Sequence, residues 1–368
     1  MADVVNSNLL DLDGDVAQLT RQLCDIESVS GNETAVADAV EHALRGIGAS
    51  GGTELEILRD GDTIVARTRL GKPERVVIAG HLDTVPLADN LPTWLDGDGD
   101  EQLIYGRGTA DMKAGVAMQL SVAAALRNPQ RDISWVFYDH EEVNAELNGL
   151  RRVTENHPDW LAGDFAVLGE PTKAGIEGGC NGTLRAEVTT RGRRAHSARA
   201  WMGVNAIHAA GHILSRLEAY QPQAKNVDGL DFQESLSAVA ISGGVAGNVI
   251  PDECVVTVNY RFAPSMSASE AAEHLGTLFE GFELRVTDSA EGARPGLDRP
   301  AAAEFVAAIG GIPEAKVGWT DVARFSALGV PAVNFGPGDP LLAHKDDEHV
   351  PVAQIYQARD ALLNWLEG

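Results

Sequence analysis

The chain has 368 residues, of which 44% are hydrophobic and 23% are charged. This length exceeds what one hydrophobic core usually supports, so we expect two domains in a soluble globular protein. The 54 acidic residues outnumber the 29 basic ones and give a net charge of -25. Nucleic acids and anionic membrane surfaces are therefore excluded as expected partners, because phosphate binding needs a basic surface.

The N-terminus and the cysteines indicate where the protein works. The first residues, MADVVNSNLLDLDGD, lack the basic start and the apolar run of a signal peptide. No apolar stretch of the chain reaches the roughly 18 residues that span a bilayer. Cys24, Cys180 and Cys254 are odd in number and widely spaced, which argues against a disulfide framework. We therefore expect a cytoplasmic protein.

Strands alternate with helices in the first and last parts of the chain. The expected elements there are helices within 15–48, 113–126 and 352–365, and buried strands at 75–80, 133–138, 166–168 and 330–335. Buried strands that alternate with helices are typical of an α/β layer. These parts of the chain therefore predict an α/β domain.

The middle of the chain differs, because its strands have one apolar and one polar face. The elements expected there are a strand at 184–188, a helix at 207–217, strands at 236–245 and 254–262, a helix opened by a Ser267–Glu270 capping box, and a strand at 282–286. This β-α-β-β-α-β order is typical of a ferredoxin-like α+β domain. We predict an α/β domain over 1–179 and 293–368, interrupted by an inserted domain over 180–292.

A histidine and an aspartate follow the first buried strand. His81 and Asp83 are two residues apart, so on an extended chain their side chains point the same way. They lie at the carboxyl end of the strand, where open α/β sheets place their sites. A metal-bound histidine usually needs a carboxylate on its second ring nitrogen. His81 as ligand and Asp83 as its orienting partner meet that need; a turn with a capping aspartate is the alternative.

Acidic residues follow three further loops or strands. Asp111 lies in the stretch GRGTADMK directly before the alanine-rich helix, where an N-cap is the simpler explanation. Glu141 and Glu142 follow the next buried strand, and their side chains diverge, so one can bind a metal while the other faces a substrate. Paired acids are, however, also common on surfaces. Glu170 follows a later strand.

His344 completes a set of metal donors. It lies in the loop GPGDPLLAHKDDE, where a single histidine is usually only solvated. Taken together, however, two histidines and several acids that follow strand ends are the donors of a two-metal site for zinc or a similar ion. One carboxylate can bridge two ions roughly 3.5–4 Å apart, and another carboxylate is then left to act as a base.

These motifs, in this order and spacing, resemble the M20 family of metal-dependent amidohydrolases and exopeptidases over nearly the whole chain. The resemblance implies Asp111 as a bridging ligand, with His81 and Glu170 on one ion and Glu142 and His344 on the other. It further implies Glu141 as general base, Asp83 as the support of His81, and a cis peptide bond between Asp111 and Met112. The implied cofactors are two divalent metal ions per subunit, zinc above all, with cobalt or manganese as substitutes.

Within this family the chain is most similar to the desuccinylases. The stretches that carry this similarity are HSARAWMGVNAIH, GGVAGNVIPDE, NYRFAP and WTDVARFSALGVPAVNFGPGDPLLAH. The implied reaction is hydrolysis of N-succinyl-L,L-diaminopimelate, a step in the synthesis of lysine and of peptidoglycan precursors. The best-known branch has an arginine where this chain has Cys180-Asn181, and T-S-D-G where it has Trp319-Thr320-Asp321-Val322. Substrate contacts at these two places are therefore not carried over.

The resemblance also implies how the substrate, a small N-acyl amino acid, is held. Glu141 takes a proton from the attacking water and delivers it to the leaving amine. His196 of the inserted domain, from the partner subunit, reaches the oxyanion. Asn248 and Arg261 contact the carboxylate end of the substrate. These roles imply a homodimer formed through the inserted domain, which would act as both a lid and a dimerisation domain.

Several alternatives stay open. Arg191, Arg193, Arg194 and Arg199 form a basic island that either steers an anionic substrate or is simply solvated. Among enzymes, an N-acetylornithine deacetylase and a dipeptidase or carboxypeptidase of the same family are the alternatives. Outside enzymes, they are a structural dimerisation protein and a binding relative without catalysis, which the presence of Glu141 argues against.

Overall fold

The chain folds into two compact units. The computed structural model describes residues 9–49 and 52–368. One unit takes in Met1–Gly178, Gly296–Glu314 and Arg324–Gly368, and the other takes in Gly179–Pro295 and Ala315–Ala323. The second unit thus includes 315–323, which the sequence had grouped with the α/β part. Backbone pairing explains this, because the N–H of Asn181 donates to the carbonyl of Lys316 at 3.2 Å.

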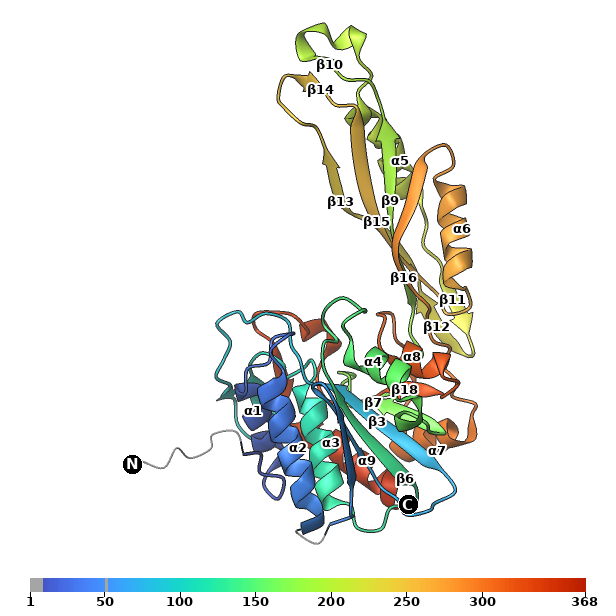
Figure 1. Ribbon diagram of the computed structural model, residues 1–368. Coiled ribbons are helices and arrows are strands. Elements are labelled where there is room, and N and C mark those ends of the chain that lie inside the picture. The colour runs from blue at the N-terminus through green and yellow to red at the C-terminus, as the bar shows by residue number, and fades with distance from the viewer. Residues whose placement is uncertain (1–8, 50–51) are drawn as a thin grey trace, which may run out of the picture. The chain divides into compact units, whose positions relative to one another are not determined.

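A mixed eight-stranded sheet, counted over the described residues, forms the centre of the first unit (Figure 1). In sheet order its strands are β1 (Glu56–Asp60), β2 (Thr63–Arg67), β6 (Asp132–Tyr138), β3 (Arg75–His81), β7 (Phe165–Leu168), β18 (Ala332–Asn334), β8 (Glu177–Gly178) and β17 (Glu314–Ala315). Strands β6, β3, β7 and β18 run parallel to one another. Their carboxyl ends therefore meet at one edge of the sheet, where α/β folds place their sites.

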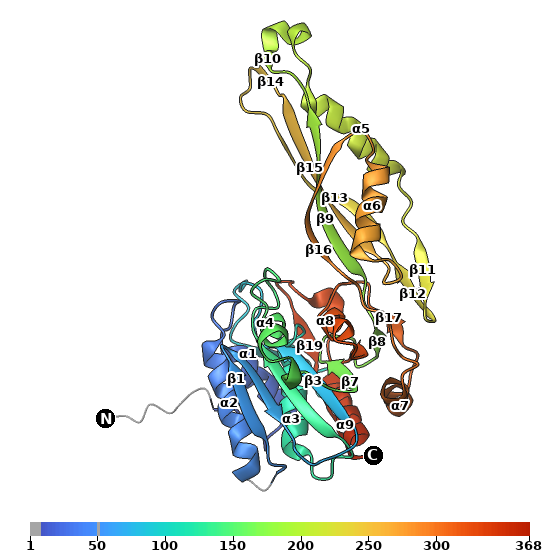
Figure 2. The ribbon, with the colours of Figure 1, turned by 45° about the vertical axis from the view of Figure 1, so that its right-hand side comes forward.

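Helices cover this sheet and bury its central strands. The helices of this unit are α1 (Val16–Asp25), α2 (Thr34–Ala49), α3 (Lys113–Ala125), α4 (Gly149–Asn156), α7 (Pro300–Ile309) and α9 (Val352–Glu367). Helices α1, α2 and α3 lie side by side, α9 packs on α1 and α3, and α4 contacts β2 (Figure 2). Strands covered on both faces need apolar residues throughout, which is why the sequence predicted β3 and β6 correctly. Over the described part of the chain, every helix is too short or too polar to cross a membrane.

Short elements connect the larger ones. A small sheet in the order β19 (His349–Pro351), β5 (Leu103–Tyr105) and β4 (Trp94–Asp96) joins the C-terminal part of the chain to the GRGTADMK stretch. Helix α8 (Val322–Ala327) and the 3-10 helices η1 (Gly99–Glu101), η2 (Pro158–Trp160), η3 (Ser197–Met202) and η4 (Pro340–Leu342) complete the connections. Three-residue strands show too little periodicity to be predicted from sequence.

The second unit has the predicted β-α-β-β-α-β order. Its main elements are β9 (Gly182–Arg191), α5 (Ala206–Ala219), β13 (Ser235–Gly243), β15 (Glu253–Phe262), α6 (Ala268–Leu278) and β16 (Glu283–Ala290). The strands form an antiparallel sheet in the order β13-β15-β9-β16, and the predicted capping box opens α6. Two further pairs form separate two-stranded sheets: β10 (Ala195–His196) with β14 (Val249–Ile250), and β11 (Ala224–Val227) with β12 (Leu230–Gln233). The predicted α/β fold with an inserted α+β domain is confirmed.

Helix α3 approaches the sheet so closely that only glycine fits at one position, which makes a prediction for stability. A Cβ on Gly115 would lie 2.0 Å from the carbonyl oxygen of Gly169, whereas a Cβ on Gly46, in helix α2 of the same unit, would meet nothing within 4 Å. We expect Gly115→Ala to destabilise the fold by about 1–3 kcal/mol through overpacking. Gly46→Ala should stabilise it by about 0.5–1 kcal/mol. Urea unfolding of both variants tests this prediction. Equal unfolding midpoints would contradict it.

Candidate functional site

The candidate ligands emerge where neighbouring parallel strands end. His81 is the last residue of β3, the Glu141-Glu142 pair follows the end of β6, and Glu170 is buried two residues beyond β7. Strand β3 lies between the other two in the sheet. The fold therefore brings these segments to one edge, although they are up to 89 residues apart in the chain.

The two ring nitrogens of His81 face two aspartates. Nδ1 lies 3.0 Å from the carbonyl oxygen of Asp83, and Nε2 lies 3.2 Å from Oδ1 of Asp111. Because a carbonyl can only accept, the ring hydrogen belongs on Nδ1, and the lone pair of Nε2 then faces the carboxylate of Asp111. Two acceptors that face each other need a cation between them, which is either a proton or a metal ion.

His344 meets the same carboxylate from the other side. Its Nε2 lies 3.4 Å from Oδ2 of Asp111 and 3.0 Å from Oε2 of Glu142. Asp111 thus directs one oxygen toward each histidine, as a bridging ligand must. Ligand atoms of His81, Asp111 and Glu142 all lie within 4.8 Å of one another. This set of imidazole nitrogens and carboxylate oxygens fits divalent ions such as zinc.

The pKa values of these groups reflect the crowding of negative charge. Hydrogen bonds from the His344 ring to the carboxylates of Asp111 and Glu142 raise the pKa of His344 to about 10. Burial alone would lower the pKa of His81, but Asp111 and Asp83 outweigh it and raise that pKa well above its usual value. Burial likewise opposes ionisation of Asp111, yet the two imidazoles hold its pKa far below the usual range. The raised pKa values of both imidazoles mean that a metal ion bound here would compete with protons for the same ring nitrogens.

Asp83 supports the segment that carries both glutamates. Its buried carboxylate accepts the backbone N–H groups of Glu141 at 3.0 Å and Glu142 at 3.1 Å, and the hydroxyl of Ser30 donates to it at 2.6 Å. Burial would raise the pKa of Asp83, but the interaction with His81 and these donors lowers it to about 2. An ionised Asp83 therefore holds both the ring of His81 and the backbone of the two glutamates.

A network beneath this segment was missed by sequence reasoning. His140 has a φ of 57°, which places its backbone in the left-handed region. Its Nδ1 lies 2.8 Å from Oδ2 of Asp139, and its backbone N–H donates to buried Glu33 at 3.2 Å. Arg152 donates to the other oxygen of Asp139 at 2.7 Å. The run Asp139-His140-Glu141-Glu142 was the available signal, but no spacing rule separates supporting residues from ligands within it.

Two features of the Asp111 turn bear on the sequence predictions. The Asp111–Met112 peptide bond is cis, as the resemblance implied. The N-cap residue of α3 is Met112, without a side-chain cap, so the carboxylate of Asp111 faces the two histidines and does not serve as the N-cap. The simpler alternative for this residue is therefore not what the structure contains.

The predicted substrate contacts of the second unit lie in two places. His196 is exposed on β10, and Ser197 next to it donates its N–H to the carbonyl of Asn248 at 2.8 Å. Arg261 pairs with Thr183 at the opposite end of β9 from Arg191, eight residues or roughly 27 Å along the strand. Within one chain, the structure brings His196 and Asn248 together but places Arg261 far from both.

Arg261 is half-buried on the sheet. Its Nε donates to Oδ1 of Asn259 at 3.2 Å. Burial, and then the nearby charge of Arg185, lower the pKa of this guanidinium. Over residues 9–49 and 52–368, no carboxylate lies within ion-pairing distance of Arg261. It is therefore a cation that is ready to receive an anionic group.

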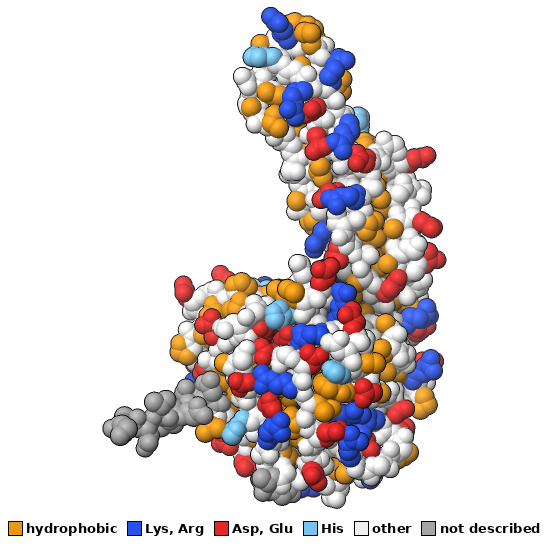
Figure 3. Space-filling model, viewed as in Figure 1, with side chains coloured by type: hydrophobic (Ala, Val, Ile, Leu, Met, Phe, Trp, Pro, Cys, Tyr) orange, Lys and Arg blue, Asp and Glu red, His pale blue; other side chains and the backbone are white. Residues whose placement is uncertain are grey.

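The arginine island, by contrast, is largely engaged locally. Arg191 pairs with Glu253 and, at 2.9 Å, with Glu283. Arg194 pairs with Asp252 at 2.8 Å, and Arg193 donates to the carbonyl of Met202 at 2.9 Å. Figure 3 shows acidic and basic side chains interspersed on this face of the second unit. The arrangement favours solvated strand ends over a steering patch.

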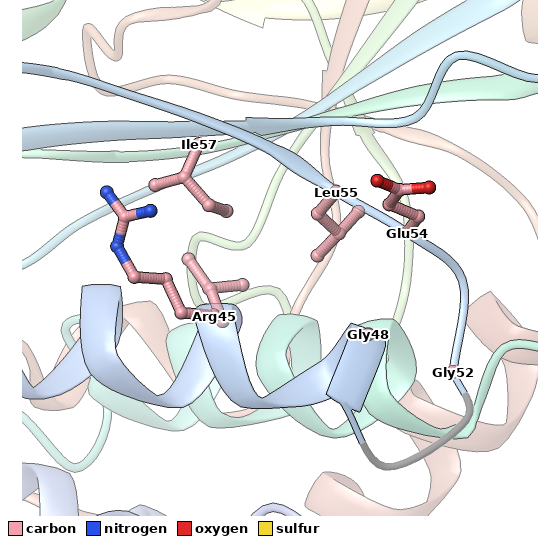
Figure 4. Close-up of a pocket in the computed structure, with 7 residues that line it drawn as sticks. Arg45, Gly48, Gly52, Glu54, Leu55 and Ile57 are labelled. Atoms are coloured by element: carbon pink, nitrogen blue, oxygen red, sulfur yellow. The ribbon is translucent and has the colours of Figure 1, made fainter.

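A cavity of about 650 Å³ lies away from these residues. It is lined by Leu44, Arg45, Gly48, Gly52, Glu54, Leu55 and Ile57. Figure 4 shows Arg45 and Glu54 on opposite sides of it. The cavity contains none of the histidines and aspartates of the ligand cluster, so its size does not make it the site of chemistry.

Comparison with known proteins assigns the chain to a family. Residues 77–368 match Peptidase family M20/M25/M40. The chain is 52% identical over 362 residues to a putative succinyl-diaminopimelate desuccinylase of Mycobacterium tuberculosis, with 98% of this chain and all of the relative covered. It is 46% identical over 374 residues to a succinyl-diaminopimelate desuccinylase of Corynebacterium glutamicum, with the same coverage.

Solved structures share the fold. A tripeptidase of Staphylococcus aureus has a TM-score of 0.78 at 20% identity and covers 98% of each chain. A dinuclear metal-binding peptidase of the M20 family from Bacillus subtilis has a TM-score of 0.70 at 19% identity and covers 96% of each chain. The present chain therefore belongs to peptidase family M20/M25/M40, and it is a hydrolase that acts on amide bonds.

Proposed function

We propose that this hydrolase removes the succinyl group from N-succinyl-L,L-diaminopimelate to give succinate and L,L-diaminopimelate. The observation that carries the proposal is the 52% identity, over 98% of the chain, to a relative with that name. The site supports it, because the donor cluster and an arginine without a carboxylate partner both suit an anionic amide substrate. The reaction belongs to the synthesis of lysine and of peptidoglycan precursors.

The proposed centre uses two divalent ions, with zinc the best fit. Asp111 would be shared between them, His81 and Glu170 would hold one ion, and Glu142 and His344 would hold the other. When bound, the ions lower the pKa of water and stabilise negative charge on the carbonyl oxygen of the substrate. The carboxylate-rich donor set also suits cobalt or manganese.

Glu141 is the proposed general base. Its carboxylate takes a proton from the attacking water and delivers it to the nitrogen of the leaving amine. Asp83 fixes this position, because it accepts the backbone N–H of Glu141. A base held in this way has the same position relative to the water and the amide in each turnover. This constant geometry is the main way in which positioning increases the rate.

Arg261 is proposed to bind the carboxylate of the succinyl group. Its planar guanidinium can form two parallel hydrogen bonds with a carboxylate. The Nε group is already held by Asn259, so the two terminal nitrogens are those that face a ligand. An acetyl group offers no carboxylate, and the half-buried cation would then remain unpaired.

The second unit is proposed to form a homodimer. Strand β13 lies at the edge of its sheet. The apolar side chains of Val239 and Ile241 on this strand, and of Val245 just beyond it, are 58%, 53% and 65% exposed. Edge strands with exposed apolar residues pair readily with a second copy. Arg261 pairs with Thr183, roughly 27 Å along β9 from Arg191, and His196 lies beyond Arg191 on β10. His196 and Asn248 would therefore serve the site of the partner subunit.

The first prediction concerns the base. Glu141→Gln keeps the size of the side chain but cannot accept the proton, so kcat should fall by about 10²–10⁴-fold. Bound metal, measured by elemental analysis, should not change. Glu146→Gln, in the exposed part of the same loop, is the control and should retain its activity. Near-normal kcat in Glu141→Gln would assign the base to another residue.

The second prediction concerns the substrate and tests the proposed function. With zinc added, kcat/KM should be much higher for N-succinyl-L,L-diaminopimelate than for N-acetylornithine, because the unpaired arginine rejects the acetyl group. Arg261→Ala should reduce the value for the succinyl substrate by about 10²-fold or more and barely affect the acetyl one. Arg285→Ala, which removes an exposed arginine paired with Glu187 in the same sheet, should affect neither. Faster turnover of N-acetylornithine would establish a deacetylase instead.

The third prediction concerns the dimer. His196→Ala and Glu141→Ala should each be inactive alone. The two variants are then mixed and allowed to exchange subunits. Half of the resulting dimers should be mixed, and each mixed dimer should have one working site of two. About a quarter of the parent activity per chain should therefore return. Exchange is followed independently by a fluorescence transfer pair. Proven exchange without any rescue would place His196 outside the partner's site.

A further inference from the structure

A buried ion pair joins the segments that carry the candidate ligands. Arg107 and Glu348 are 241 residues apart in sequence, yet Nη1 of the arginine lies 2.8 Å from Oε2 of the glutamate. Both side chains are almost completely shielded from solvent, with 3% and 1% exposed. The sequence indicated no role for either residue, although Arg107 lies within the GRGTADMK stretch.

Glu348 holds the turn that contains Asp111. Its second oxygen, Oε1, accepts the backbone N–H groups of Ala110 at 3.0 Å and Asp111 at 3.1 Å. One carboxylate therefore fixes the main chain of the proposed bridging ligand and neutralises Arg107 at the same time. Strand pairing reinforces the contact, since Glu348 directly precedes β19, which pairs with β5.

Arg107 holds the two segments that contain the histidines. Its Nε donates to the carbonyl of Pro86 at 3.1 Å, in the turn that follows His81. Its Nη1 donates to the carbonyl of Lys345 at 3.0 Å, directly after His344. His344 has a φ of 66°, a conformation that a residue with a side chain keeps only where its surroundings hold it.

We propose that Arg107 and Glu348 are positioning residues that set the separation of Asp111 and His344, and thereby the affinity of the centre for its second metal ion. The inference rests on the proposed metal centre and not on the proposed substrate. If either partner is removed, the other is left buried and unpaired. The backbone on both sides of the centre would then shift. Metal ligation requires ligand distances within narrow limits, and this shift would exceed them.

The opposite end of the same sheet provides a matched control pair. Asp132 is buried, accepts the backbone N–H groups of Leu70 and Lys72 at 2.8 and 3.0 Å, and lies 3.6 Å from Arg75. Arg75 in turn donates to the carbonyls of Ile133 and Thr68. Arg75 and Asp132 open strands β3 and β6, whereas the ligand cluster follows their other ends. This pair has the same chemistry as Arg107 and Glu348 but lies far from the centre.

The experiment compares Glu348→Gln and Arg107→Lys with Asp132→Asn in the purified full chain, using Co²⁺ as the probe. The affinity of each Co²⁺ is measured by competition with a chelator, and its ligand field is followed by visible absorption. Both positioning variants should bind the weaker Co²⁺ about 10–100-fold less tightly and show an altered absorption band. Asp132→Asn should lower the thermal midpoint yet keep the Co²⁺ affinity and spectrum of the parent. If Glu348→Gln does not fold, Arg107→Lys, which retains the positive charge, still provides the test.

Two results in the variants would overturn the inference. One is parent-like Co²⁺ affinity and absorption in the folded positioning variants, which would make the pair purely structural. The other is an equal loss of affinity in Asp132→Asn, which would attribute the effect to general destabilisation. A parent chain that binds no Co²⁺ would reject the metal centre and this inference with it. A parent that binds Co²⁺ but leaves the succinyl substrate intact would reject the proposed substrate and leave the inference standing.

Discussion

Carboxylates crowd together at the carboxyl edge of the parallel strands, and this concentration of negative charge governs the structure around it. Carboxylate oxygens of Asp111, Glu142 and Asp83 lie 3.0–3.5 Å from ring nitrogens of two imidazoles, and each carboxylate is buried or nearly so. Like charges so close in a medium of low dielectric repel strongly unless cations lie between them. Protons or metal ions held by the two imidazoles would supply that charge. The same arrangement makes the edge a strong receptor for divalent ions.

The backbone supplies much of the remaining stabilisation. Asp83 and Glu348 are both buried, and each accepts two consecutive backbone N–H groups beside a proposed ligand. A buried carboxylate must be satisfied in this way, because an unpaired one costs several kcal/mol. Lys113 follows the same rule with the opposite sign: its buried ammonium donates to the carbonyls of Leu23 and Ile26 at the end of α1. The charged groups of the GRGTADMK stretch thus tie the centre to the surrounding helices and loops.

The inserted unit is built differently, around an antiparallel sheet with one open face. Its antiparallel sheet is covered by α5 and α6 on one face, which leaves the polar positions of β9 and β15 to face outward. Arg261 sits on this open face, held by Asn259. Its long strands also separate groups that a single small substrate would have to touch together. The span of roughly 27 Å between Thr183 and Arg191 along β9 is the reason why the proposed contacts of Arg261 and His196 are assigned to two different subunits.

The sequence by itself determined the fold class and the residues that follow strand ends. Buried strands such as β3 and β6 carry continuous apolar runs, and the helix after Ser267 carries its own capping box, so these elements are encoded locally. His81 and Asp83 were recognisable because a spacing of two on a strand puts both side chains on one side. Tertiary structure alone decided the rest. The small β19-β5-β4 sheet, the Glu33–His140 contact and the Arg107–Glu348 pair join segments tens to hundreds of residues apart, and Arg261 and His196 lie apart because of strand length. Such contacts leave no periodicity in the sequence, because what selects the partners is burial of charge in the folded chain.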